Sequence, residues 1–195
     1  MKQRDQKPEG IEDLSELAQL GAIQAADVLA DLIGRRVLRC APEWHRPADF
    51  REREEWSTGV FCDVGGAHPG VAAVFLSAPG QSCVLKALCG SEAPPREFAA
   101  SALSEFGNML SSRALSAIAD RLGELLLPGL PDLATTGAAS LFHERLASGE
   151  EFAETLCVES ELFDEEGGLR VLVVLALHEP SALATGREPG AASRD

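Results

Sequence analysis

The apolar residues of this chain form two long stretches with helical spacing. In the first, apolar side chains recur every three or four positions across Leu14–Leu32, and Gly34 follows as a helix stop. In the second, they recur across Phe98–Leu122, where Gly123 is the stop and Pro95 prevents a much earlier start. The pattern therefore predicts two long amphipathic helices.

Segments with the pattern of β-strands follow each predicted helix. Two pairs of apolar segments flank Gly-containing loops and predict one β-hairpin after each helix. They are Ser57–Asp63 with Val71–Ser77, and Glu154–Phe163 with Leu169–His178. The uninterrupted apolar run Val171–Leu175 predicts a central strand that is covered on both faces. Shorter helices are expected at Gln81–Cys89 and Ala138–Ala147.

The chain contains an internal duplication. A shift of 89 residues lays Glu12–Pro42 on Ser101–Pro131 without a gap, and nine of these 31 positions are identical. The identities include Glu16 on Glu105, Ala30-Asp31 on Ala119-Asp120, and Gly34 on Gly123. We therefore expect an α+β fold with pseudo-two-fold symmetry, in which helix, strand and β-hairpin occur twice and two long helices flank one mixed or antiparallel sheet.

This duplication also predicts the domain organisation. Residues 11–178 are expected to form a single domain made of two repeats, at about 11–90 and 98–178. Residues 1–10 are polar and are expected to be flexible. Residues 179–195 are rich in Pro, Gly, Ala, Ser and charged residues, so a disordered tail is predicted there.

The charge of the chain argues against several partners. With 31 acidic and 17 basic residues, the formal net charge is −14, so no basic surface is expected for nucleic acid or for an anionic membrane. The first residues lack the apolar segment of a secretory signal, and no apolar run approaches the roughly 18 residues of a membrane span. We therefore expect a cytoplasmic protein that binds neither nucleic acid nor membrane.

The cysteines and histidines do not indicate a metal or disulfide framework. The five cysteines are an odd number without CxxC spacing, and we expect them to be buried free thiols. The four histidines are scattered and include no i, i+4 pair, so no metal site is predicted.

A polar stripe on the second predicted helix is the candidate functional site. Ser101, Glu105 and Asn108 stand at positions i, i+4 and i+7, within about 60° of one another around the helix axis, and Ser112 extends the stripe by one turn. The stripe lies away from the apolar seam and should face solvent or a partner. A simple solvated helix face would show the same pattern. However, an Asn inside a helix has a local cost, and Glu16 repeats the carboxylate in the first copy.

The residue types in this stripe suit a water-positioning role. A carboxylate can pair with a lysine of a partner, and a carboxamide can orient a water molecule without itself being a nucleophile, as a Gln does in GTPases. The chain has no P-loop, no GxSxG or HExxH motif, and no GxGxxG between a strand and a helix. If the chain is an enzyme, its substrate must therefore supply most of the catalytic groups.

These residues resemble the signature of the CheC/CheX/FliY family of CheY-P phosphatases. That signature is Asp or Ser, three residues, Glu, two residues, Asn, 22 residues and Pro. The second repeat matches every spacing, with Ser101, Glu105, Asn108 and Pro131. The resemblance extends from about residue 14 to about residue 177 and includes the duplication and both hairpins.

The resemblance implies a substrate and a role for each residue. The substrate is a phosphorylated CheY-like receiver domain, whose aspartyl phosphate lies beside its own Mg²⁺ and lysine. Glu105 would pair with that lysine, and Asn108 would orient the attacking water. Ser101 would support Glu105 or contact the partner, and Pro131 would shape the chain after the helix. No covalent intermediate would form on this chain, and no cofactor or metal of its own is expected.

The first repeat departs from this signature. It has Glu12, Glu16, Gln19 and Pro42 at the matching positions. The longer Gln side chain moves the carboxamide by roughly 1.5 Å, and a displacement near 1 Å lowers positioning catalysis about 100-fold. We therefore expect a degenerate second site that is weak or silent, although the unrelated phosphatase CheZ is understood to use a Gln for the same water.

Two alternatives to the phosphatase remain open. In the first, the chain has the same fold but is a non-catalytic binding protein, like the middle domain of the flagellar switch protein FliM or CheC proteins that act mainly by binding the receptor deamidase CheD. Glu105 would then be an anchor for a phospho-receiver or for CheD. In the second, it is an acidic structural or adaptor protein with no link to receiver domains. The complete signature in the second repeat favours the phosphatase.

Overall fold

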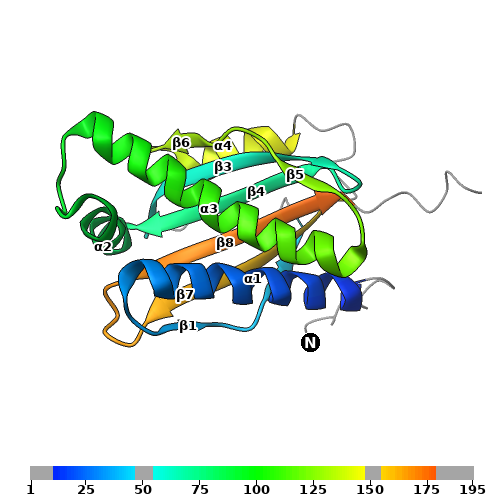
Figure 1. Ribbon diagram of the computed structural model, residues 1–195. Helices are drawn as coiled ribbons and strands as arrows, with labels where there is room; N and C mark the ends of the chain where they lie inside the picture. The colour runs from blue at the N-terminus through cyan, green and yellow to red at the C-terminus, as the bar shows by residue number, and fades with distance from the viewer. Residues whose placement is uncertain (1–10, 47–54, 148–154, 179–195) are drawn as a thin grey trace, which may run out of the picture.

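A computed structural model describes residues 11–46, 55–147 and 155–178 (Figure 1). The predictions of a flexible N-terminus at 1–10 and a disordered tail at 179–195 fall outside these residues. In chain order the elements are α1 (Ile11–Ile33), β1 (Val37–Arg39), β2 (Glu43–His45), β3 (Trp56–Gly66), β4 (Gly70–Ser77), α2 (Ala78–Cys89), α3 (Arg96–Leu122), β5 (Leu126–Pro128), β6 (Asp132–Ala134), α4 (Ala138–Ala147), β7 (Thr155–Asp164) and β8 (Arg170–His178).

The strands form one antiparallel sheet in the order β1-β7-β8-β4-β3-β5, in which β2 also pairs with β7 and β6 also pairs with β3. The pairing exchanges strands between the two repeats. The short strands β1 and β2 of the first repeat pair with β7 of the second, and β5 and β6 of the second pair with β3 of the first. The two hairpins meet where β4 pairs with β8. This symmetric exchange confirms the predicted α+β fold.

Helices cover both faces of the sheet. In Figure 1, α1 and α3 lie side by side and antiparallel across one face, and α4 lies on the other. Alternate residues of β8 pack on opposite faces of the sheet, because successive side chains of a strand point in opposite directions. Val173 packs in the same cluster as Phe106 of α3, whereas Val174 packs in the same cluster as Phe142 of α4. The predicted burial of β8 on both faces is therefore confirmed.

Local capping chemistry sets the helix boundaries. The residues that follow α1 and α3 are glycines with positive φ, 67° at Gly34 and 69° at Gly123, as the sequence predicts. α2 starts at Ala78, three residues before its predicted start. The reason is an N-cap, since the Oγ of Ser77 accepts a hydrogen bond from the N–H of Gly80 at 3.1 Å. α4 has its predicted bounds.

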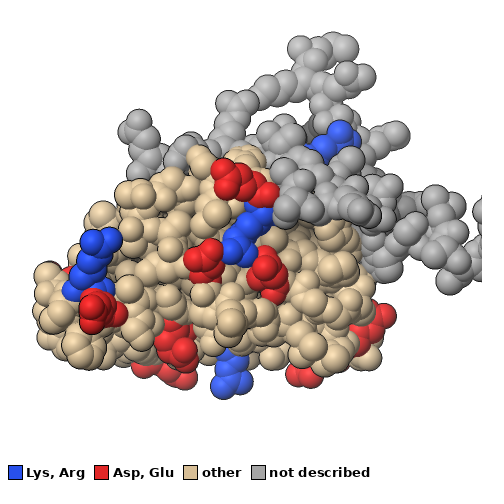
Figure 2. All heavy atoms as spheres, turned by 90° about the horizontal axis from the view of Figure 1, so that it is seen from above, with Lys and Arg blue, Asp and Glu red and all other residues tan. Residues whose placement is uncertain are grey.

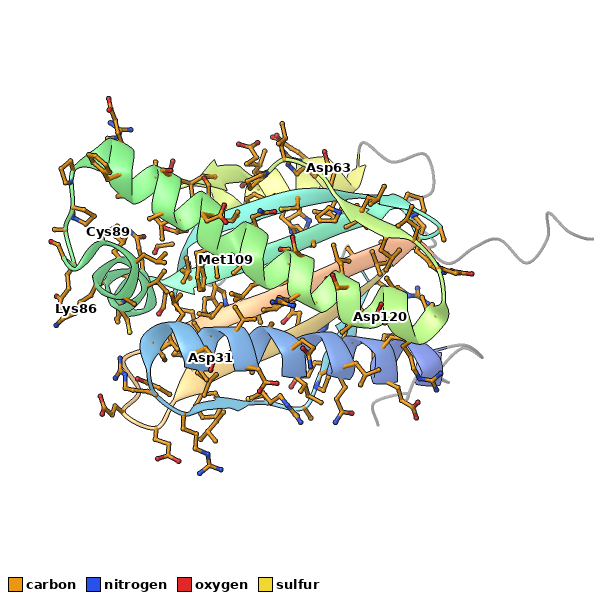
Figure 3. The ribbon with its side chains drawn as sticks, in the orientation of Figure 1. Asp31, Asp63, Lys86, Cys89, Met109 and Asp120 are labelled. Carbon is orange, nitrogen blue, oxygen red and sulfur yellow. The ribbon has the colours of Figure 1, made fainter. Side chains whose placement is uncertain are left out.

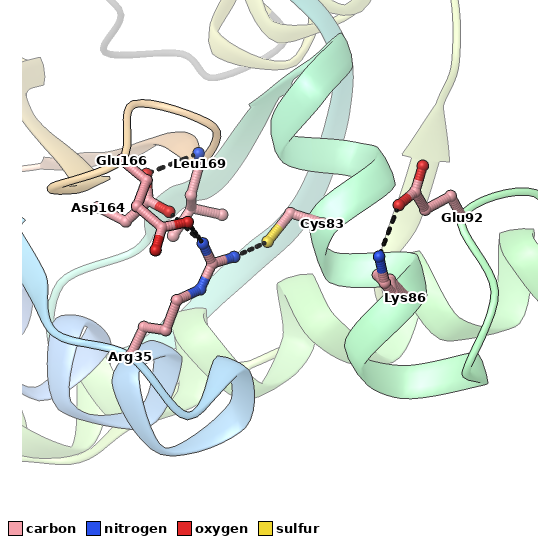
Figure 4. Close-up of polar contacts among 7 residues, drawn as sticks. All are labelled: Arg35, Cys83, Lys86, Glu92, Asp164, Glu166 and Leu169. Atoms are coloured by element: carbon pink, nitrogen blue, oxygen red, sulfur yellow. Dashed lines mark hydrogen bonds and ion pairs between the residues drawn. The ribbon is translucent and has the colours of Figure 1, made fainter.

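An ion-pair cluster fixes the end of α1 against the second hairpin (Figure 4). The Nη1 atom of Arg35 lies 2.9 Å from the Oδ2 of Asp164 and 2.6 Å from the Oε2 of Glu166, and its Nη2 donates to the Sγ of Cys83 at 3.0 Å. The Asp164 side chain is only 1% exposed, and its Oδ1 accepts a hydrogen bond from the N–H of Leu169 at 3.0 Å. Through these contacts, the buried carboxylate of Asp164 holds in place the segment that follows α1 and the turn between β7 and β8.

The cysteines differ in their exposure. Cys62 and Cys157 are buried, Cys83 is half-buried, and Cys40 and Cys89 are exposed. The prediction of buried free thiols is thus wrong for Cys40 and Cys89, which lie in a connecting segment and at the end of α2. Burial raises the pKa of Cys62, and burial together with the nearby charge of Glu159 raises the pKa of Cys157 to about 12.

Exposure, together with the raised pKa values of the two buried thiols, predicts which cysteines react. Because the thiolate is the reactive form, a thiol reagent at pH 8 is expected to modify Cys40 and Cys89 within the native protein but not Cys62 or Cys157. Mass spectrometry of the labelled protein, native and in denaturant, would measure this. Labelling of Cys157 in the native protein as fast as Cys40 would contradict the packing around β7.

The charged side chains form no basic surface on the side seen in Figure 2. On the described part of this face, the basic side chains are scattered and do not gather into a patch. Arg145 is one basic residue with acidic neighbours, since it lies 2.7 Å from a carboxylate oxygen of Asp63 and 2.6 Å from one of Asp132. Within the described ranges, no helix is both long and apolar enough to span a bilayer.

Candidate functional site

The polar stripe lies on the outer side of α3, away from the sheet. Ser101 and Glu105 are exposed, and Asn108 is half-buried. The opposite side of the helix carries the fully buried Leu103 and Phe106, which pack in the core. Burial of that apolar seam orients the stripe outward, as the helical period requires.

Close contact between α3 and β3 fixes the distance of the polar stripe from the sheet. Gly107 stands directly before Asn108 and packs against Val60 of β3, so closely that a Cβ at this position would overlap the Val60 side chain. The equivalent residue of the first repeat, 89 positions earlier, is the buried Ala18. The requirement for glycine at this position is therefore specific to α3, the helix of the repeat that has the complete signature.

Asn108 lies in a groove between α3 and α1. The groove is lined by Val28, Asp31 and Leu32 of α1 and by Asn108, Met109, Ser112, Arg113 and Ser116 of α3. The sequence predicts that Asn108 lies on an exposed face of its helix. In the structure α1 packs alongside α3, so residues of α1 form one side of the groove around Asn108. The carboxamide is thus accessible from one side and shielded on the other.

One hydrogen bond orients the Asn108 carboxamide. The Oγ of Ser112, one turn later, donates to the Oδ1 of Asn108 at 3.4 Å, which is long for a hydroxyl donor. Among the described residues, no other hydrogen bond reaches the Asn108 side chain, so its N–H donors are left for water or a partner. The first repeat has Ile23 at the position of Ser112 and offers Gln19 no such contact.

The site contains unpaired charges of both signs. In the described part of the chain, Glu105, Asp31 and Arg113 form no ion pair with one another or with any other side chain. No cluster of three or more His, Cys, Asp or Glu residues there is arranged to hold a metal ion. The groove can therefore offer a carboxamide and charged side chains to a partner.

Pro131 is not part of α3. It is half-buried in the bend between β5 and β6, at the edge of the sheet next to β3. Just before it, the N–H of Gly129 donates to the carbonyl oxygen of Asp63 at 2.7 Å. The structure thus brings Ser101, Glu105 and Asn108 together on α3, but it places Pro131 in the connection that follows the helix.

The degenerate site lies at the other end of the helix pair. Glu16 and Gln19 are exposed on α1, and a second groove is lined by Glu16, Leu17, Leu20, Arg121 and Leu122. Glu12 is in α1, but its side chain is outside the described ones. Pro42 is half-buried directly before β2, as Pro131 is before β6. Because α1 and α3 run antiparallel, the two sites occupy opposite ends of the same surface.

Comparisons with known proteins agree with the signature. Residues 98–124, which include most of α3 and its polar stripe, match the model of the CheC-like family. A search of curated protein sequences found no match. The family match confirms the resemblance that the sequence motif indicates.

Solved structures with the same fold include a FliY, a CheX and the middle domain of a FliM. FliY of Thermotoga maritima has a TM-score of 0.60 at 17% identity, with 88% of this chain and 92% of that chain covered. CheX of Borrelia burgdorferi, solved as a CheX–CheY–BeF3–Mg²⁺ complex, has a TM-score of 0.59 at 15% identity, with coverage of 82% and 96%. The FliM middle domain of Vibrio alginolyticus has a TM-score of 0.55 at 10% identity, with coverage of 84% and 92%. At these identities, the likeness establishes the fold.

Proposed function

We propose that this chain, which has a CheC-like fold, is a phosphatase that hydrolyses the aspartyl phosphate of a CheY-like receiver domain. The observation that carries the proposal is the arrangement of Glu105 and Asn108, one turn apart on the accessible side of α3. The CheX–CheY complex of B. burgdorferi supports a receiver as the class of partner. The family match over residues 98–124 supports the same conclusion.

In this proposal Asn108 orients the attacking water. The carboxamide enters the receiver's site and holds the water in line with the phosphorus atom. The water oxygen bonds to phosphorus as the bond from phosphorus to the aspartyl oxygen breaks, which releases inorganic phosphate and the free carboxylate. The hydrogen bond from Ser112 to Asn108 limits rotation of the carboxamide before the receiver binds.

Glu105 aligns the two proteins. Its exposed carboxylate pairs with the lysine beside the receiver's phosphate, and Ser101, one turn earlier, supports that contact. The Mg²⁺ that neutralises the phosphoryl oxygens is a component of the receiver. This division of roles leaves positioning as the contribution of this chain, and it requires no nucleophile or metal here.

The experiment that tests this proposal measures phosphate loss from an isolated CheY-like receiver. The receiver is phosphorylated with a small-molecule donor, freed of the donor, and incubated with substoichiometric amounts of this protein. Phosphate loss several-fold faster than the receiver's intrinsic decay is expected, and the rate should rise with protein concentration. Decay at the intrinsic rate at every concentration would refute the enzymatic function.

The second candidate is a binding protein without catalysis. The likeness to the FliM middle domain favours it, because the same fold serves a protein of the flagellar switch. Stable binding of the phosphorylated receiver, or of CheD, without faster phosphate loss would identify this function. Failure to bind an activated receiver or CheD would instead favour the structural or adaptor class.

A further inference from the structure

An aspartate is repeated at the same position of both repeats, outside the family signature. Asp31 in the first repeat and Asp120 in the second are 89 residues apart, and both follow an alanine. Both side chains are exposed on the outer side of the helix pair. Neither contributes to the core, so packing does not explain why both repeats carry an aspartate there.

The antiparallel helix pair brings Asp31 to the site of the other repeat. Asp31 lines the same groove as Asn108, although the two residues come from different helices and different repeats. Figure 3 shows Asp31 near the end of α1, Met109 in the middle of α3, and Asp120 toward the other end of the pair. Symmetry places Asp120 in the corresponding position relative to the degenerate Glu16 and Gln19.

The position of Asp31 is fixed by the rest of the fold. It lies in the last turn of α1, one turn before Arg35, whose guanidinium is held by Asp164 at the end of β7 and by Glu166 in the turn that follows. The end of α1 therefore cannot swing away from the groove without breaking a cluster that includes a buried carboxylate. This anchoring keeps the Asp31 carboxylate on the groove wall.

Asp31 has no partner within the described part of the protein. It forms no hydrogen bond or ion pair there, and Arg113, which lines the same groove, is not within ion-pair distance of it. A carboxylate on a receiver-facing wall, with its charge uncompensated, is available to a basic side chain of the receiver. Its location, one helix across from Asn108, extends the acidic contact surface beyond Glu105.

We propose that Asp31 completes the Glu105–Asn108 site as a second anionic docking residue for the receiver, so that the site is built from both repeats. This inference rests on the proposed function. Asp31 acts by binding a basic side chain of the receiver near its phosphorylation site and not on the phosphoryl group itself. It is a positioning residue, and its loss should affect binding far more than the chemical step.

The experiment compares Asp31→Lys with Asp120→Lys. Both variants change the net charge from −14 to −12, two units each, at pseudo-equivalent exposed positions, so their effects on overall electrostatic steering should match. Asp31→Lys is expected to raise KM, and the Kd for the phosphorylated receiver, about tenfold, with kcat within twofold of wild type. Asp120→Lys should leave all three near wild type. The Asp31→Lys defect should shrink at high salt.

Asp31→Asn guards against misfolding of the charge-reversal variant, and a rise in KM of about threefold is expected for it. Equal effects of Asp31→Lys and Asp120→Lys, or no effect of either, would overturn the inference. If wild type speeds phosphate loss but Asp31→Lys behaves identically, only the role of Asp31 fails. If wild type neither speeds phosphate loss nor binds the receiver, the proposed function fails together with it.

Discussion

Asn108→Ala is expected to lower kcat for receiver dephosphorylation about 100-fold, while the Kd for the phosphorylated receiver stays within about threefold. The reason is that Asn108 supplies the oriented carboxamide, whereas Glu105 and the rest of the surface supply docking. The side chain is half-buried and, within the described residues, makes one long hydrogen bond, to Ser112, so its removal should hardly change the free energy of unfolding. Single-turnover decay of the phosphorylated receiver measures kcat directly.

Two further variants control this result. Gln19→Ala removes the equivalent side chain of the degenerate site, and it is expected to lower total activity by less than about twofold. Asn108→Gln gives the second repeat the carboxamide of the first, displaced by about one methylene, and should fall between wild type and Asn108→Ala. Equal activity of wild type and Asn108→Ala would show that Asn108 does not position the water.

The long elements of the fold were predictable because their patterns are strong. α1, α3 and the two hairpins each repeat an apolar period over many residues. One strand between each long helix and its hairpin was predicted, but without bounds, and the structure has two short strands there in each repeat. Three residues are too few for an alternation to be recognised, so their number and positions were not predicted. A signal for them was present in the duplication: β1 at Val37–Arg39 and β5 at Leu126–Pro128 are exactly one repeat apart, as are β2 and β6.

The site was predictable only in part, for a related reason. The polar stripe is a property of one helix, so the spacing of Ser101, Glu105 and Asn108 was enough to find it. The groove depends on which helix packs beside α3 and in which direction, and neither is encoded in the period of a single segment. Asp31 was visible as an identity between the repeats, but its proximity to Asn108 follows only from the antiparallel pairing of α1 and α3.

Gly107→Ala is expected to damage both stability and activity. A Cβ at this position would overlap Val60 of β3, and even the more distant methyl carbon, Cγ2, would lie only 2.8 Å away. Overpacking of this kind costs about 1–3 kcal/mol, and the gain of about 1 kcal/mol that alanine brings to a helix offsets part of that cost. The free energy of unfolding in urea should therefore fall by up to about 2 kcal/mol. Because α3 can relieve the overlap only by moving away from the sheet, Asn108 moves with it, and kcat should fall by about tenfold or more.

The matched control is Gly168→Ala in the turn between β7 and β8, where a Cβ would meet nothing within 4 Å. That variant should keep both the unfolding free energy and kcat of wild type. A loss of both stability and kcat in Gly107→Ala, but of neither in Gly168→Ala, would identify the overlap with Val60 as the cause. A protein with Gly107→Ala that loses stability but keeps full kcat would mean that the height of α3 above β3 does not set the position of Asn108. A protein that loses neither would mean that Val60 can yield, and that the close approach of helix and sheet is not required for the site.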